Sequence, residues 1–273
     1  MMSAKSKPAL EPVPSPAFPS GEAAPGPEPA AAPEANERAL TALDEDRESF
    51  LSSLSLHTDS ILRNREHIYE SIARRQSLGR AIAVYFTMTV LFGGFYGATM
   101  GAFKSGPQAL VSATKVPLLL FLSLAVATPA LYVFNTILGS KIRPIQTIAT
   151  CAAGMATVSV LLLALSPLSI FFMLSGASYA FLKLFHIVMF FVAGYFGAFV
   201  LYDGLQTIAM RVGHNQNMTL LQIWLCLYAY VGVQMAWILR PFLGDPSRPF
   251  ALFRPSEGNF FKAALDALLA VLR

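Results

Sequence analysis

The ionisable side chains best placed for chemistry within an apolar run are Lys183 and His186, which lie one helical turn apart. If that run crosses a membrane, such groups are costly to bury, and they commonly mark a path for ions, protons or solutes. We therefore treat the pair as a candidate polar gate. The more ordinary interpretation is an interfacial pair that reaches water from a helix end. Asp203 cannot complete a proton relay with His186 along the same helix, because a rise of about 1.5 Å per residue separates them by about 25 Å.

Sequence motifs for established catalytic chemistry are not found. The chain contains no HExxH, no Gly-x-Ser-x-Gly, no phosphate-binding loop and no Cys/His set with the spacing of a metal site. Both cysteines, Cys151 and Cys226, lie in apolar runs, where a thiol behaves as a small hydrophobic group. We therefore expect no enzymatic activity, no metal and no other cofactor.

A stretch rich in cations and aromatic rings follows the last apolar run. Pro241 should end the helix near Arg240, because proline lacks a backbone donor and disfavours helical geometry in the residue before it. Trp237 and Arg240 then stand where an indole takes the headgroup level and a guanidinium reaches phosphate. Arg-Pro-Phe occurs twice, and Arg248 and Arg254 are further candidates for contact with lipid headgroups. An ordinary stop-transfer flank has the same pattern, which leaves a specific lipid or partner site as the alternative.

Glycines recur at intervals of three or four in two apolar runs. The first run carries Gly93, Gly97 and Gly101, and a later one carries Gly194 and Gly197. Small residues at this spacing let another helix approach closely. We expect these faces to pack helices within one chain, and a homo-oligomer formed through them is the alternative.

The elements that must position these side chains are strongly apolar. The chain is 55% hydrophobic and 13% charged, outside the usual balance of a soluble domain. Five runs approach the length of about 20 residues that a helix needs to cross the hydrocarbon core. They lie within residues 81–103, 116–138, 145–165, 184–202 and 219–239. The sequence therefore predicts an all-α membrane protein with a bundle of about five transmembrane helices over residues 81–240.

The number of crossings depends on residues 166–182, which are uncharged and short. We interpret this segment as an interfacial or re-entrant loop, with a sixth crossing as the alternative. Arg74, Arg75 and Arg80 precede the first run, and with five crossings most of the Lys and Arg bias places the amino terminus in the cytoplasm. We expect an integral, multi-pass protein of a bacterial cytoplasmic (inner) membrane.

Outside the bundle, the sequence divides into three further segments. Residues 1–36 hold half of the chain's 18 prolines, which predicts a disordered tail. Residues 37–80 carry a broken heptad stripe, typical either of a cytoplasmic coiled coil that sets oligomeric state or of a helix or helix pair lying on the membrane domain. If these residues form a helix pair, we expect the serine-rich stretch 52–56 to separate its two helices. Residues 241–273 form an exit segment followed by an amphipathic helix, too short to span a bilayer and therefore interfacial.

The partners expected from these features are membrane lipid and a protein bound through residues 37–80. The net charge of +4 suits an anionic lipid surface. Basic and aromatic residues do not alternate on a polar face, so nucleic acid is not expected.

A cytoplasmic amino-terminal region, about five membrane helices and a short carboxy-terminal tail together resemble the Yip1-type family of integral membrane proteins. The run KVPLLLFLSLAVATPALYVFNTILG, residues 115–139, is similar to the proline-containing second helix of bacterial relatives. The resemblance covers roughly residues 81–239. It implies a role in membrane trafficking as a non-enzymatic partner, in eukaryotic members a partner of small GTPases. The long Arg-Pro-Phe exit departs from the family's pattern.

Two functions from different classes follow. The first is a non-enzymatic scaffold that organises partners or lipid through the cytoplasmic helix and the basic interface. The alternative is a channel or transporter that uses a polar site around Lys183 and His186. An intramembrane enzyme is the third hypothesis and would need polar groups that meet in one pocket.

Overall fold

The chain divides into two units, Met1–Glu48 and Ser49–Arg273. The computed structural model describes residues 48–137, 142–212, 218–245, 247, 249–253 and 260–272. The predicted disordered tail, residues 1–36, lies outside these ranges. Within them every regular element is a helix, as the sequence predicts.

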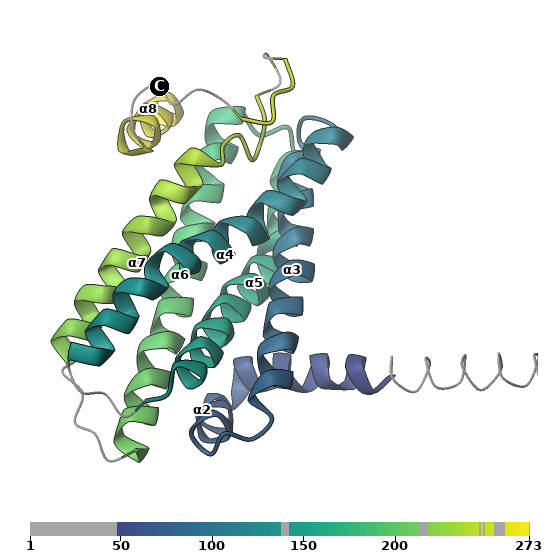
Figure 1. Ribbon diagram of the computed structural model, residues 1–273. Helices are drawn as coiled ribbons and strands as arrows, with labels where there is room; N and C mark the ends of the chain where they lie inside the picture. The colour runs from purple at the N-terminus through teal and green to yellow at the C-terminus, as the bar shows by residue number, and fades with distance from the viewer. Residues whose placement is uncertain are drawn as a thin grey trace, which may run out of the picture. The chain divides into compact units, whose positions relative to one another are not determined.

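Five helices of the second unit are long and apolar enough to cross a membrane. They are α3 (Leu78–Ala102), α4 (Gly106–Ile137), α5 (Pro144–Leu174), α6 (Tyr179–Arg211) and α7 (Met218–Ile238). Successive helices run in alternating directions, and α4 packs mainly against α3 and α7 rather than against α5 (Figure 1). The predicted fold class is therefore confirmed, and the protein is an integral, multi-pass membrane protein. Because the crossings are odd in number, the residues before α3 and those after α7 lie at opposite ends of the bundle.

The interpretation of residues 166–182 as a re-entrant loop or a sixth crossing is wrong. α5 continues through Pro167 to Leu174, and α6 begins at Tyr179 after a tight turn in which Gly176 has a φ of +75°. Pro167 suggested a helix end, but a proline is tolerated inside membrane helices where neighbouring groups compensate for the lost bond. The segment is the tip of an α5–α6 hairpin.

α5 is the central helix of the bundle, between α3 and α6 (Figure 1). Every residue from 149 to 160 is buried, and most are Ala, Gly, Ser or Thr. Small side chains let neighbouring helices approach closely on several faces at once. The sequence of α5 thus favours a core helix that brings α3 and α6 together.

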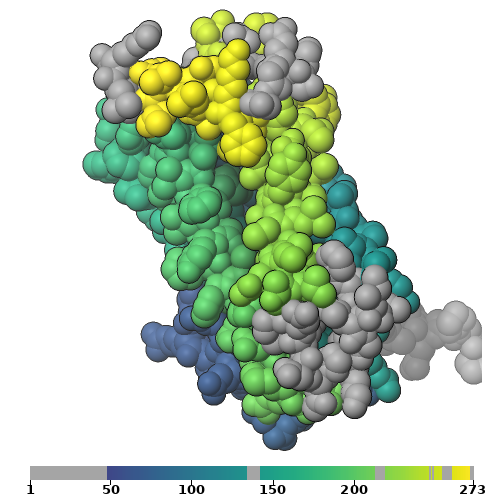
Figure 2. All heavy atoms as spheres, turned by 90° about the vertical axis from the view of Figure 1, so that its left-hand side faces the viewer, coloured from purple at the N-terminus to yellow at the C-terminus, as the bar shows by residue number. Residues whose placement is uncertain are grey.

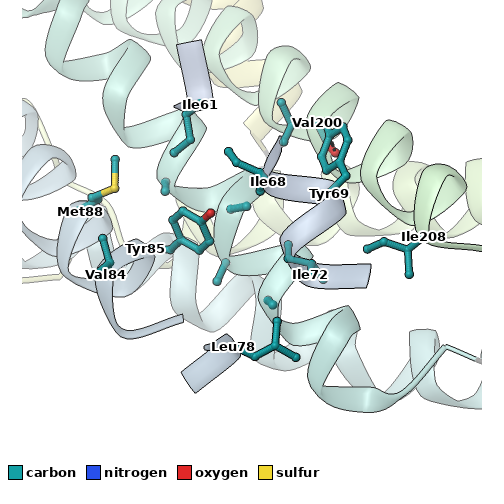
Figure 3. Packing of buried hydrophobic residues seen from close by; sticks show 14 of the residues in the cluster. Ile61, Ile68, Tyr69, Ile72, Leu78, Val84, Tyr85, Met88, Val200 and Ile208 are labelled. Carbon is teal, nitrogen blue, oxygen red and sulfur yellow. Dashed lines mark hydrogen bonds between the residues drawn. The ribbon is translucent and has the colours of Figure 1, made fainter. Parts of the chain in front are cut away.

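Before α3, the chain forms a helix pair that packs on the end of the bundle. The first member covers residues 48–63; we call its part in the second unit, residues 49–63, the arm. The second is α2 (Arg65–Ala73). Figure 3 shows Ile61 of the arm and Ile68 and Ile72 of α2 in one buried cluster with residues of α3 and α6. Of the two interpretations of residues 37–80, the described part matches the helix pair lying on the membrane domain.

The break between the pair lies at Asn64, so the predicted break at residues 52–56 is wrong. The helix passes through the serine-rich stretch because the hydroxyls bond back to carbonyls one turn earlier. Ser52 and Ser53 both donate to the carbonyl of Ser49, at 2.9 and 2.8 Å, and Ser55 donates to that of Ser52. These local bonds satisfy the side chains without interrupting the helix.

α2 is held to the bundle by two buried polar contacts. The Tyr69 hydroxyl donates to the carbonyl of Val200 in α6 at 3.1 Å. Burial, with the Asp203 carboxylate nearby, raises the pKa of Tyr69, so the phenol stays protonated and able to donate. Gln146, at the start of α5, donates to the carbonyl of Ile72 at 3.1 Å. Since the last carbonyls of a helix lack partners within it, this amide both caps α2 and fixes its position.

At the other end, α8 (Phe260–Leu272) lies across the ends of α6 and α7 (Figure 2). Ala267 is buried against the bundle, whereas Phe261, Leu265 and Leu268 are 60%, 54% and 40% exposed. A 13-residue helix that turns large apolar side chains outward has the character of an interfacial helix. The predicted amphipathic helix is therefore present at the predicted place.

Candidate functional sites in the bundle

The structure does not bring Lys183 and His186 into one site. His186 is 1% exposed and points into the bundle, where its Nδ1 lies 2.7 Å from the Tyr96 hydroxyl and its Nε2 lies 3.4 Å from the Ser169 hydroxyl. The Lys183 ammonium instead donates to the carbonyl of Ala263 in α8 at 3.1 Å. One residue joins helices inside the bundle, and the other holds α8 against α6.

The Tyr96, His186 and Ser169 side chains form a buried polar bridge between α3, α6 and α5. One tautomer satisfies both contacts: the Tyr96 hydroxyl donates to Nδ1, and the Nε2 proton is donated to Ser169. Phe185 and Phe190 pack edge-on against the two rings of this bridge, with centroids 5.5 and 5.6 Å away. A serine beside a histidine is a familiar nucleophile pair, yet Ser169 is fully buried and closed to a substrate. The geometry supports a structural role.

Substitution of Tyr96 by phenylalanine should measure the strength of this bridge. The change removes one hydroxyl and leaves the buried Nδ1 without its donor, so we expect a loss of about 1–3 kcal/mol in the free energy of unfolding. The measurement is unfolding in detergent micelles followed by tryptophan fluorescence. Tyr195→Phe, on the exposed face of α6, is the matched control and should change stability little. Equal stability of the two variants would contradict the role assigned to the bridge.

A second polar site, not anticipated from the sequence, lies where α4 meets the exit segment. Gln108, Ser112 and Lys115 form a polar row along α4, which we call the α4 clamp. Gln108 Nε2 donates to the carbonyls of Pro241 and Phe242, both at 3.2 Å, and the Ser112 hydroxyl also donates to Phe242. All three clamp side chains are at least 96% buried. The clamp therefore fixes the exit segment from its first residues.

Lys115 extends the clamp to the far side of the exit segment. Its ammonium donates to the carbonyl of Pro241 at 3.3 Å and to that of Leu252, and it lies 4.6 Å from the centre of the Phe253 ring. Carbonyl dipoles and the negative face of an aromatic ring both favour a cation. One ammonium thus joins two parts of the exit segment that are eleven residues apart, Pro241 and Leu252.

The glycines of α3 let this helix pack closely against α4 at the clamp. A Cβ added to Gly97 would lie 2.2 Å from the carbonyl oxygen of Ser112, and one added to Gly101 would lie 2.4 Å from that of Gln108. These glycines therefore pack against the backbone of two clamp residues, in the same chain. Gly93 faces Ser159 of α5 at 3.3 Å by the same measure.

The glycines of α6 differ from one another. Gly197 meets Val158 and the carbonyl of Gly154 on α5, with added-Cβ distances of 2.4 and 3.0 Å, whereas a Cβ on Gly194 would meet nothing within 4 Å. Only Gly197 of this pair is thus required for close packing of α6 on α5.

The interface candidates after α7 are described only in part. α7 ends at Ile238, and the Leu239 amide still donates to Met235, which confirms the predicted helix end next to Arg240. The Arg240 guanidinium stacks 3.5 Å from the centre of the Trp237 ring. Arg248 and Arg254 lie outside the described residues. Contact of these side chains with lipid headgroups stays a prediction.

In the part of the chain that the structure describes, no three His, Cys, Asp or Glu side chains gather where they would hold a metal ion. Comparison with protein families, with curated proteins and with solved structures finds no match for this chain. The site geometry and the physical character of the bundle are therefore the basis of a functional proposal.

Proposed function

We propose that this protein is a non-enzymatic scaffold of the membrane, which holds protein partners at one face through the arm and α2. The observation that carries the proposal is the combination of fixed docking and an outward apolar side chain. The arm is fixed on α3, because Ile61 is buried in one cluster with Tyr85 and His57 packs edge-on against the same ring. On the arm, Leu56 is 66% exposed. A rigidly held helix with an exposed leucine is well suited to present a binding surface, because it loses little conformational freedom when a partner binds.

The internal polar contacts support a scaffold over a transporter. Lys115 and His186 are 4% and 1% exposed, and both bond to other parts of the chain, Lys115 to the exit segment and His186 to Tyr96. A transport path needs such groups to face a route for the solute. Here they instead hold helices and the exit segment in place.

The resemblance of the sequence to the Yip1-type family favours the same class of function. We further propose that the protein is Yip1-like and that its partner is a protein. In this proposal the arm lies on the cytoplasmic side of a bacterial inner membrane. Small GTPases are the partners that the resemblance suggests.

Substitution of Leu56 by glutamate tests the proposal. We expect partner proteins recovered by cross-linking in native membranes to fall about tenfold, since loss of one central apolar contact costs about 1.4 kcal/mol or more. Leu110→Glu is the matched control, because Leu110 is 75% exposed at the opposite end of the bundle. Recovery is measured by quantitative mass spectrometry of the cross-linked material.

An unchanged set of cross-linked proteins in the Leu56→Glu variant would contradict the scaffold role. Ion or solute flux into liposomes that contain only this protein, abolished by His186→Ala, would favour the transporter instead. The two outcomes are measured independently, on membranes and on purified protein.

A further inference from the structure

A groove of about 450 Å³ lies where the arm meets the side of α3. The groove is open along the arm and is not an enclosed cavity. One part of its lining is apolar and includes Leu51, Leu54 and Phe92. The other part is polar and includes Ser55, Asp59 and Arg63. The lining is therefore amphiphilic.

The groove extends from the arm into the membrane-spanning part of α3. The arm runs across the end of the bundle and crosses α3 (Figure 1). His57 of the arm packs edge-on against Tyr85 of α3, with ring centroids 5.3 Å apart. Phe92 lies seven residues further along α3 on the same stripe, and therefore about 10 Å deeper in the span. A helix in the membrane interface buries its apolar face about 5–10 Å into the boundary between headgroups and acyl chains.

The polar part of the groove carries one charge of each sign. Arg63 Nε lies 3.3 Å from Asp59 Oδ1, and the two side chains are 82% and 66% exposed. An ion pair this exposed is weak, so its members can exchange partners at little cost. A guanidinium suits a phosphate, and a carboxylate suits an ammonium. The pair is therefore complementary to a zwitterion that carries both groups.

We propose that the groove binds one zwitterionic phospholipid of the surrounding bilayer, such as a phosphatidylethanolamine. Its phosphate lies at Arg63, its ammonium at Asp59, and one acyl chain runs past Leu54 towards Phe92. A phospholipid is the amphiphile already present at this depth, and its headgroup and chain match the two parts of the lining. The inference is separate from the proposed protein partner, because Leu56 does not line the groove.

Two serine-to-tryptophan substitutions in the arm test the groove. Ser55→Trp places an indole in it, whereas Ser52→Trp makes the same change at an exposed position that does not line it. The full-length protein in mild detergent is titrated with phosphatidylethanolamine or phosphatidylglycerol, and bound lipids are counted by native mass spectrometry. We expect the wild type and Ser52→Trp to bind one phosphatidylethanolamine at least tenfold more tightly than phosphatidylglycerol. Ser55→Trp should lower that affinity at least tenfold.

A second variant separates the headgroup from the chain. The double substitution Asp59→Asn and Arg63→Gln keeps the apolar lining, so one lipid should still bind, but without preference between the two headgroups. The proposal is overturned if Ser55→Trp binds phosphatidylethanolamine as the wild type does, or if the wild type binds both lipids equally. An equal loss in Ser52→Trp would overturn it as well. None of these readouts depends on partner recovery in membranes.

Discussion

Replacement of Gly97 by alanine should cost about 3 kcal/mol or more of the free energy of unfolding. The added Cβ would lie 2.2 Å from the Ser112 carbonyl oxygen and 2.8 Å from its carbon, so α3 and α4 must move apart. Both obstacles are backbone atoms, which cannot rotate away as a side chain end does, and forced overpacking of this kind is destabilising. Unfolding in detergent, or the fraction of monodisperse protein after solubilisation, measures the effect.

Gly79→Ala in the same helix is the control, because a Cβ there meets nothing within 4 Å. Alanine is a better helix former than glycine by about 1 kcal/mol, so this variant should be as stable as the wild type or more so. If Gly97→Ala also matched the wild type, the close crossing of α3 and α4 would be wrong.

Substitution of Lys115 by methionine should release the exit segment. Methionine retains much of the apolar volume but leaves the carbonyl of Leu252 without this donor, at a cost of about 1–3 kcal/mol, whereas the carbonyl of Pro241 keeps its bond from Gln108. We expect amide hydrogen exchange in residues 241–253 to rise at least tenfold, because the segment opens without unfolding of the bundle. Mass spectrometry of peptic fragments resolves this region.

Thr114→Val is the control for Lys115. Thr114 is exposed on the adjoining face of α4, and its hydroxyl only bonds back to Leu110 at 3.2 Å. Exchange in residues 241–253 should therefore stay at the wild-type rate. Equal rates in Lys115→Met and the wild type would remove the clamp as the anchor of the exit segment.

The parts of the fold that were predictable depend on local composition. A run of about 20 apolar residues has few stable alternatives to a crossing helix, and the five spans follow from that alone. The tip of the α5–α6 hairpin is not predicted, because Pro167 usually ends a helix in a soluble domain but is tolerated inside a helix of a membrane bundle. The break is predicted at the serine-rich stretch and not at Asn64, because the sequence does not show that serine hydroxyls in the arm donate hydrogen bonds to carbonyls of their own helix.

The sites were less predictable, because their partners are distant in sequence. Lys183 and His186 are three residues apart, which rotates them by about 60° around α6. That rotation is enough for one to meet α8 and the other to meet α3 and α5. The row Gln108, Ser112 and Lys115 is visible in the sequence, but its partners are backbone carbonyls, which every residue possesses. Only the fold selects which carbonyls those are.

The length of α5 has a consequence for the bilayer. This helix has 31 residues, none of them charged, and is about 46 Å long, whereas the hydrocarbon region is about 30 Å thick. Such hydrophobic mismatch is relieved by tilting or by local thickening of the lipid. Leu174 at the hairpin tip is 83% exposed, and exposure of this apolar side chain to lipid is more favourable than its exposure to water. The protein should therefore concentrate in thicker regions of its membrane or deform thinner ones around itself.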